Sequence, residues 1–493
     1  MKTIVETSTK LSKYLLADNV AITSTADNIT VGDPAQFIIG DLNSTTVTIT
    51  DNVTNAPANW TGNRYTFDGT NWTANPNWAL GNGKTVIVNS DGTVTEAGGP
   101  AQAVTNAATF SGSNQIDSTS QASVFDSNSN RIVLVYRDNS NSFYGTAIVG
   151  TVSNSSISFG TAVVIESAQL NYFDADFDSN SNKVVIGYSS GSGHQGKGIV
   201  GTVDPSDNSI SFGSATNTSN GISVQQSVTF DSSTNKLAFI YRASNNRLTG
   251  RTATVSGTSI SFGNEASFDD DNSTDISAAF DSNRNRVVVA YGDQGNSGRG
   301  SARVITTDST PSASSEVHFG SANADETATV FDSNSNKIVI AYQDTANSEF
   351  GTAVVGTVAA NNTISFGTPV VFESATAQNI DICFNPDLNQ VLIIYADEGN
   401  SNAGTAVVGT VSETSISFTS PFVWYTGSGK GRVSYDTNIN KAVISYQDGS
   451  GNLGKYRIYT FGAPNLTSEN FIGITPSAYP TGAGAEIQTK GAI

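Results

Sequence analysis

The segment Phe331–Tyr342 reads "FDSNSNKIVIAY", and the segment Phe177–Tyr188 reads almost the same, "FDSNSNKVVIGY". The opening aromatic residue returns about every fifty residues, and in each copy a tyrosine follows it eleven residues later. The aromatic residues are Phe125, Phe177, Phe230, Phe280, Phe331, Phe384 and Tyr435, and the tyrosines are Tyr136, Tyr188, Tyr241, Tyr291, Tyr342, Tyr395 and Tyr446. A period of this length is typical of architectures that repeat one small supersecondary unit.

Each copy contains signals for four short strands. The turn "DSNSN" ends in an asparagine in all seven copies, and Asp and Asn favour tight turns because they bond their own backbone and tolerate left-handed conformations. The run that follows, such as "KIVIAY", is apolar on both faces, which in a strand indicates packing on both sides. Segments such as "GTAVVGTV" and "SISFGT" then supply a third and a fourth strand. We therefore expect a small antiparallel meander in each copy.

The two ends of the repeat region indicate how the meanders are arranged. The seventh copy stops after its third strand, at "YRIYTFG". Before the first copy, an isolated "NAATFSG" around Phe110 takes the position of a preceding unit's "SISFG". This segment can supply the missing outer strand of the last unit. The sequence therefore predicts an all-β fold in which residues 101–462 form a seven-bladed β-propeller of about 51-residue repeats, closed by an N-terminal strand.

Composition narrows the possible partners. The chain has 493 residues, 37% of them hydrophobic and 14% charged, and a formal net charge of −19. Nucleic acid and anionic lipid are poor partners for such a charge, because binding them relies on Lys and Arg. No stretch is long enough to span a bilayer, and the N-terminus lacks the apolar run of a secretory signal peptide. The single cysteine, Cys383, excludes an internal disulfide and is expected in a buried strand.

Three recurring features are better explained by structure than by chemistry. The turn "DSNSN" resembles the start of a calcium loop, but the sixth and twelfth positions after Asp126 are Arg131 and Arg137 instead of Gly and Glu. We therefore predict a polar hairpin and no metal site. The repeated tyrosines are expected to pack in the core with their hydroxyl groups at a polar edge. An aspartate two residues later is expected to set the next turn, with a carboxylate pair between blades as the alternative; it recurs at Asp138, Asp293, Asp344, Asp397 and Asp448.

Catalytic signals are weak. The chain has two histidines, His194 and His318, which the repeat places far apart and without a nucleophile at a recognisable spacing. We therefore predict a protein that is not an enzyme and has no catalytic residues and no cofactor. Chemistry that uses only carboxylates stays open, because the chain has 43 Asp and Glu residues.

Sequence variation between the copies is concentrated in the loop between the second and third strands. In a propeller this loop lies on the same face as the connections between blades, and binding sites concentrate on loops carried by a rigid scaffold. We call this the diversified face; drift of unconstrained loops is the alternative explanation. The candidate ligand contacts on it are Tyr144, His194, Arg247, Arg299, Phe350 and Glu398, together with Trp424 and Tyr425 from "FTSPFVWYTGSG".

The ends of the chain do not follow the repeat. Residues 1–98 contain three of the four tryptophans, Trp60, Trp72 and Trp78, and predict a small β-rich domain whose aromatic residues form either its core or an attachment surface. Residues 463–493 form a short C-terminal extension.

Three segments resemble one group of proteins. The opening "MKTIVETSTKLSKYLLAD" with "YTFDGTNW", the repeat "FDSNSNKIVIAYQDTANSEFGTAVVGTV" and the ending "LTSENFIGITPSAYPTGAGAEIQTKGAI" are similar to parts of tail-fibre-like and structural virion proteins of marine bacteriophages, cyanophages especially. In those proteins the C-terminal module usually continues past "TKGA", so here it is either short or completed by a partner. The resemblance transfers no catalytic residue.

The resemblance implies a virion protein that is made in the host cytoplasm. Its N-terminal domain would bind other virion proteins, and its propeller would bind a host-surface receptor, a glycan or a protein. Two alternatives stay open: a decoration or connector protein of the capsid or tail, and a glycan-degrading enzyme. A homo-oligomer such as a trimer also stays open, because no coiled-coil heptads specify three chains.

Overall fold

The computed structural model describes residues 102–462, except for the side chains of Asn220, Ser321 and Ala322, and the backbone of short strands between residues 22 and 96 and between residues 471 and 488. The chain divides into two compact units, Met1–Ala103 with Phe461–Ile493, and Val104–Thr460. Both are built from β-strands, and the helical elements of the second are three single turns: η3 (Gln294–Asn296), η4 (Thr345–Asn347) and η5 (Glu398–Asn400). Among the described residues, no helix has the length and apolar character to cross a membrane.

The first unit contains strands from both ends of the chain. Its main sheet has the order β1-β2-β3-β38-β37-β6-β7, and β4 pairs with β5 in a separate hairpin. The C-terminal segment, which the sequence analysis treats as an extension, thus supplies two strands of a sheet that it shares with the N-terminal strands. Trp60 and Trp78 lie outside the described residues. The strands are β1 (Ile22–Thr25), β2 (Asn28–Val31), β3 (Thr46–Ile49), β4 (Tyr65–Phe67), β5 (Trp72–Ala74), β6 (Thr85–Val88), β7 (Val94–Glu96), β37 (Phe471–Ile474) and β38 (Ala485–Gln488).

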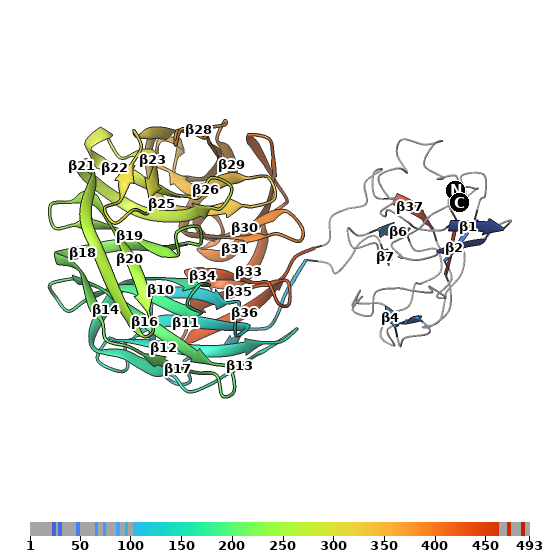
Figure 1. The fold of residues 1–493 in the computed structure, drawn as a ribbon, viewed down its shortest axis with the longest axis horizontal. Coiled ribbons are helices and arrows are strands. Elements are labelled where there is room, and N and C mark those ends of the chain that lie inside the picture. The colour runs from blue at the N-terminus through green and yellow to red at the C-terminus, as the bar shows by residue number, and fades with distance from the viewer. Residues whose placement is uncertain are drawn as a thin grey trace. The chain divides into compact units, whose positions relative to one another are not determined.

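The second unit repeats one antiparallel pattern (Figure 1). An inner strand pairs with a second strand, and the second strand pairs with a third. The inner strands are β10 (Ile116–Asp126), β14 (Val163–Asp178), β18 (Thr216–Asp231), β21 (Ser259–Asp281), β25 (Val317–Asp332), β29 (Val370–Asn385) and β34 (Gly431–Asp436). The second strands are β11 (Arg131–Asp138), β15 (Lys183–Ser190), β19 (Lys236–Ala243), β22 (Arg286–Asp293), β26 (Lys337–Asp344), β30 (Gln390–Asp397) and β35 (Lys441–Gln447). The third strands are β12 (Tyr144–Val152), β16 (Gln195–Asp204), β20 (Arg247–Ser256), β23 (Arg299–Thr306), β27 (Phe350–Val358), β31 (Ala403–Ser412) and β36 (Gly454–Thr460).

Most outer strands are made of two pieces. A short strand pairs with one end of the third strand, and the first half of the next inner strand pairs with its other end, as β13 and β14 do on β12. Five inner strands therefore also serve as the outer strand of the preceding meander. After the sixth meander the two roles are separate: β33 is its outer strand, and β34 is the inner strand of the seventh. The short strands are β13 (Ile157–Phe159), β17 (Ser209–Phe212), β24 (Ser312–Ala313), β28 (Ile364–Phe366), β32 (Ser415–Phe418) and β33 (Phe422–Ser428).

The segment around Phe110 pairs with β36, but in a different register from the one expected. Strand β9 (Ala108–Thr109) pairs near the start of β36, and β8 (Ala103–Val104) lies beside β36 nearer its end. The Phe110 ring covers Gly454 as the Trp424 ring covers Gly404. Phe110 thus corresponds to Trp424, whereas β8 takes the place of "SISFG". The prediction that "NAATFSG" itself takes that place was wrong, because the aromatic residues of the two outer pieces look alike in sequence.

The turn and tyrosine predictions are confirmed. The last asparagine of each "DSNSN"-type turn is left-handed, with φ between 52° and 56°, and the preceding Asp or Asn side chain accepts backbone N–H bonds within the turn. All seven repeated tyrosines are at most 1% exposed. Four of them donate their hydroxyl proton to a carboxylate, as Tyr188 does to Glu166 at 2.9 Å. Cys383 is buried in β29, also as expected.

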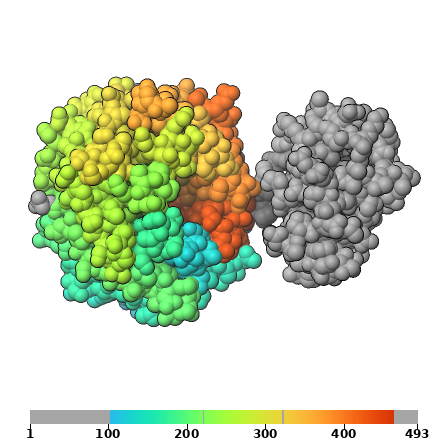
Figure 2. Space-filling model, in the orientation of Figure 1, coloured from blue at the N-terminus to red at the C-terminus, as the bar shows by residue number. Residues whose placement is uncertain are grey.

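Neighbouring inner strands lie side by side and are linked by polar side chains. Each inner strand contacts the next one in the order β10, β14, β18, β21, β25, β29, β34, and β34 contacts β10 in turn. Four links repeat at one position, three residues before the recurring aromatic, where a side chain accepts the backbone N–H of the next inner strand: Asp174 from Val228, Ser227 from Ala278, Ser277 from Thr329 and Asp381 from Val433, at 2.7 to 3.1 Å. In Figure 2 the blue start and the orange-red end of this unit lie next to each other.

Candidate functional site

Four of the eight predicted contacts occupy one equivalent position. Tyr144, Arg247, Arg299 and Phe350 are each the first residue of a third strand. Each is directly opposite a polar residue of the next inner strand: Gln169, Asn272, Asn323 and Thr376, respectively. Both arginines bind groups of the protein itself: Arg247 forms a salt bridge with Asp270 at 3.0 Å, and Arg299 Nε donates to the Gly320 carbonyl at 3.0 Å. Glu398 is exposed in η5.

Trp424 is a core residue, and this corrects the sequence prediction. It is 2% exposed, its Nε1 donates to the Thr405 carbonyl at 3.1 Å, and its ring packs on Gly404. The reason is positional: Phe372 fills the equivalent place over Gly351, so the repeat reserves this site for a large buried side chain. Tyr425 is half-buried, stacks on Trp424 and accepts the Gly449 N–H with its hydroxyl oxygen at 3.0 Å.

His194 belongs to a group of aromatic residues that the sequence analysis did not identify as a group. Its ring meets the Tyr172 ring edge-on at 5.7 Å. Arg137 lies nearby, since it donates to the Asn171 side chain and its guanidinium covers the Phe143 ring at 5.4 Å. Phe143 and Tyr172 are 44% and 38% exposed. We call Arg137, Phe143, Tyr172 and His194 the aromatic patch.

The backbone of the aromatic patch is strained. Phe143, Tyr172 and His194 have φ values of 62°, 51° and 50°, respectively. These lie in the left-handed region, which bulky residues rarely adopt and which costs about 1–2 kcal/mol per residue. Such strain concentrates at functional sites, where the surrounding structure holds it in place. Exposed aromatic rings in this setting suit flat contact with the apolar face of a ligand. Phe143 is visible in the variable loop of the sequence, but nothing in the sequence marks Tyr172.

Tyr172 is one member of a repeated bulge. Each of five inner strands shifts its register at one point, and the residue in the shift is left-handed, with φ between 50° and 56°. These residues are Tyr172, Gln225, Asp275, Glu326 and Asn379. A bulge turns a side chain away from the regular strand direction. The backbone is therefore constant at this position while the side chain differs in every copy.

The inner strands surround a channel. One cavity of about 460 Å³ is lined by residues of β10, β14, β18, β21, β25, β29 and β34. A second cavity of about 180 Å³ is lined by four of the bulge residues, Tyr172, Gln225, Asp275 and Glu326, and also by Thr119 and Arg432. We call this second cavity the channel mouth. The two cavities share several lining residues, Phe173 and Arg432 among them.

Carboxyl groups along the channel have raised pKa values. Burial raises the pKa of Asp174 to about 7 and that of Asp176 to about 6, although each accepts two backbone N–H bonds. At the mouth, burial and then the charges of Glu326 and Asp325 raise the pKa of Asp275 to about 6. Burial also raises the pKa of Glu326, against the opposing effect of Arg432 and Lys430. The mouth therefore holds two carboxyl groups, Asp275 and Glu326, whose charged forms are disfavoured by burial.

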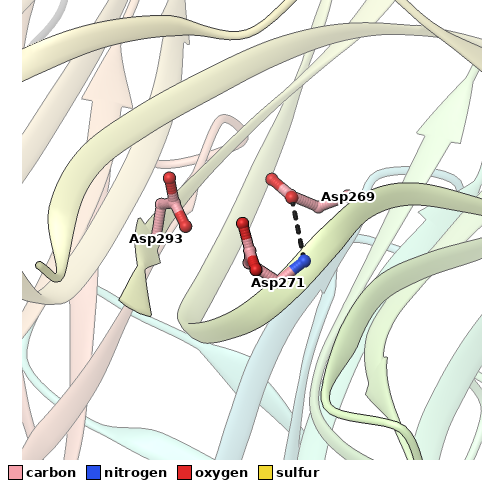
Figure 3. A group of neighbouring side chains, drawn as sticks. All are labelled: Asp269, Asp271 and Asp293. Atoms are coloured by element: carbon pink, nitrogen blue, oxygen red, sulfur yellow. Dashed lines mark hydrogen bonds between the residues drawn. The ribbon is translucent and has the colours of Figure 1, made fainter. Parts of the chain in front are cut away.

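A separate acidic group lies at the η3 turn (Figure 3). Asp269, Asp271 and Asp293 each place one carboxylate oxygen within 4.8 Å of the others, a donor set that hard cations such as Ca²⁺ accept. Two of the three carboxylates already bind other groups of the protein. Asp269 binds the Tyr291 hydroxyl at 2.8 Å and Arg303 at 3.3 Å, and Asp293 accepts the Gly295 N–H at 3.0 Å. The role predicted for Asp293, setting the turn, accounts for its position; Asp138, Asp397 and Asp448 make equivalent turn contacts.

His318 has neighbours that resemble a catalytic group but are not arranged as one. Ser301 Oγ lies 2.8 Å and Glu316 Oε1 3.3 Å from the same ring nitrogen, Nδ1. In a Ser-His-acid triad, the serine and the acid contact opposite nitrogens of the histidine ring. Ser301 is also fully buried. The arrangement is therefore not that of a catalytic triad.

Comparison with known proteins supports the fold class. No protein-family model matches the chain, and no curated protein matches it. A crystal structure of the BP39L lectin from Burkholderia pseudomallei is similar, with a TM-score of 0.52 and 12% identity over 71% of this chain and 98% of that one. A Lactobacillus plantarum protein (TM-score 0.47, 13% identity, 67% and 88% of the chains) and a Dyadobacter fermentans protein of unknown function (0.47, 10%, 73% and 100%) are also similar. The chain has a propeller-like all-β fold.

Proposed function

We propose that Val104–Thr460 is a seven-bladed β-propeller whose ring is closed by packing instead of a continuous sheet. The hydrogen-bonded path is open, since β33 and β34 fall in different sheets. Contact between β10 and β34 and the pairing of β9 with β36 support closure. The Tyr456 hydroxyl, which accepts the Ile157 N–H at 2.9 Å, links the last meander to the first.

We further propose that the protein binds a carbohydrate receptor through the diversified face and is not an enzyme. The observation that carries this proposal is the aromatic patch, two exposed rings held in strained backbone beside a guanidinium and an imidazole. Sugar rings present apolar C–H faces and polar edges, and such a group offers a matching surface. The similar lectin fits this proposal as an example of what a related fold can bind.

The resemblance to marine-phage virion proteins gives the proposed setting. The protein would be a component of a virion surface, a tail fibre or similar appendage, and the unit built from both chain ends would attach it to other virion proteins. The acidic composition, with a net charge of −19, is compatible with a partner that is neither nucleic acid nor an anionic membrane.

The test is binding of the full-length protein to marine cyanobacterial cells and to their extracted surface polysaccharide, with release of reducing sugar measured in the same tube. We expect saturable binding without sugar release. Phe143→Ala and Tyr172→Ala should each weaken binding about tenfold or more, as truncation of an interface anchor does. Val371→Ala, which truncates an exposed apolar side chain in the first half of β29, is the matched control. Sugar release would show an enzyme. Absence of binding by the folded protein would favour a decoration or connector protein that contacts only other virion proteins.

A further inference from the structure

The channel mouth has the lining of a small binding site. All seven inner strands contribute to it, from Thr119 in β10 to Arg432 in β34. Its lining combines an exposed aromatic ring, two amides, two carboxylates and a guanidinium. A pocket with a few convergent polar groups on a rigid frame is the usual form of a ligand site. Its volume of about 180 Å³ suits a small molecule or one end of a larger one.

The mouth is continuous with the aromatic patch through one side chain. Tyr172 lines the mouth and also contacts His194. A ligand that lies across Phe143 and Tyr172 therefore reaches the mouth without leaving the protein surface. The bulge sets the direction in which the Tyr172 side chain leaves the strand, and so places its ring at this junction.

We propose that the channel mouth binds the terminal residue of the receptor glycan, and that this terminal sugar carries no negative charge. The proposal deepens the proposed function and rests on it. A chain end fits the mouth best, because residues of all seven inner strands line it. The aromatic patch then holds the residues that precede the terminal one.

The preference for an uncharged sugar follows from the lining. The Asp275 carboxylate interacts with the Thr274 hydroxyl and the Glu326 N–H, and the Glu326 carboxylate interacts with the Asn379 N–H, which leaves further acceptor sites on both carboxylates. The Gln225 side-chain oxygen is buried without a hydrogen-bond partner. These groups accept bonds from sugar hydroxyls. Asp275, Asp325 and Glu326 outnumber Lys430 and Arg432, so an acidic sugar would meet net repulsion.

The experiment uses an array of oligosaccharides immobilised through their reducing ends. Pairs share one internal sequence and differ only at the free end, which is either a neutral sugar or the same sugar capped with a uronic or sialic acid. The full-length protein should bind glycans with a particular neutral end and should bind their acid-capped partners at least tenfold more weakly. Asp275→Asn and Glu326→Gln keep the side-chain shape, and we expect each to weaken binding to the neutral end about tenfold and to reduce the discrimination.

Asp271→Asn is the matched control, because Asp271 is an exposed carboxylate on the same strand as Asp275 but does not line the mouth. It should leave both affinities unchanged. Binding that depends on the internal sequence whatever the free end, or that prefers acid-capped glycans, would overturn the inference while leaving carbohydrate binding through the aromatic patch intact. No binding to any glycan on the array, by protein that is folded, would overturn both.

Discussion

Phe110 connects the beginning of the repeat region to its end, so Phe110→Ala measures how much this junction contributes to stability. The ring is 5% exposed, covers Gly454 and meets Tyr136 edge-on at 5.3 Å. Truncation of a buried phenylalanine costs about 3–5 kcal/mol. Unfolding entropy is about 2.1 cal/mol/K per residue, so over the unit Val104–Thr460 this cost corresponds to a fall in Tm of roughly 4–7 °C.

The assay is thermal unfolding by calorimetry, with Phe372→Ala as the matched control. Phe372 covers Gly351 in the same way but lies within the continuous 24-stranded sheet. We expect Phe110→Ala to lower Tm at least as much as Phe372→Ala does, because β9 pairs with β36 through only two residues and depends on the ring for its position. A Phe110→Ala protein with wild-type Tm, beside a destabilised Phe372→Ala protein, would refute the reasoning that this segment closes the ring.

Three further predictions concern stability. Burial raises the pKa of Asp174 in the folded protein to about 7, above its usual value of 3.8. The contribution of Asp174 to folding stability is therefore fully present below about pH 4 and is lost as the pH rises through 7. Asp174→Asn should make Tm depend less on pH over this range, and an unchanged dependence would contradict the assignment. In Gly404→Ala the new Cβ would lie 2.6 Å from the Trp424 ring, so we expect the free energy of unfolding to fall by about 1–3 kcal/mol in chemical denaturation. Gly193→Ala, whose Cβ has no atom within 4 Å, should leave it unchanged. Equal denaturation midpoints for the two variants would count against this packing. Asn336→Ala should cost about 1 kcal/mol because φ is 56°, whereas Asn336→Gly should cost less, and the reverse order in the same assay would be inconsistent with a left-handed turn.

The repeating parts of the fold could be predicted because their physics is local. An Asp or Asn side chain that accepts N–H bonds two and three residues later defines a turn wherever it occurs, as at Asp332. A tyrosine at a fixed distance from that turn is then placed in the core by strand alternation alone. Both features depend on residues within one copy, and the sequence repeats them often enough to be recognised.

The errors arose where copies fill the same space with different side chains. The place over the glycine of the third strand holds Trp424 in one copy, Phe372 in another and Phe110 in a third. Packing there selects for volume rather than for one residue type, so Trp424 looked like a unique surface aromatic and Phe110 like a member of "SISFG". The position is identified only by the residue that it packs against, which for Trp424 is a glycine about twenty residues earlier in the chain. That contact cannot be read from the sequence.

The bulges could not be predicted for a related reason, and they bear most directly on function. A left-handed residue is usually signalled by Gly or Asn, yet this position holds Tyr172, Gln225, Asp275 and Glu326 as well as Asn379. If the bulge served only the backbone, Gly or Asn in every copy would avoid the conformational cost. Four other side chains are held there by the surrounding sheet, and all four line the channel mouth. What they have in common is the cavity that they face, so a ligand in that cavity gives the most direct reason for their presence.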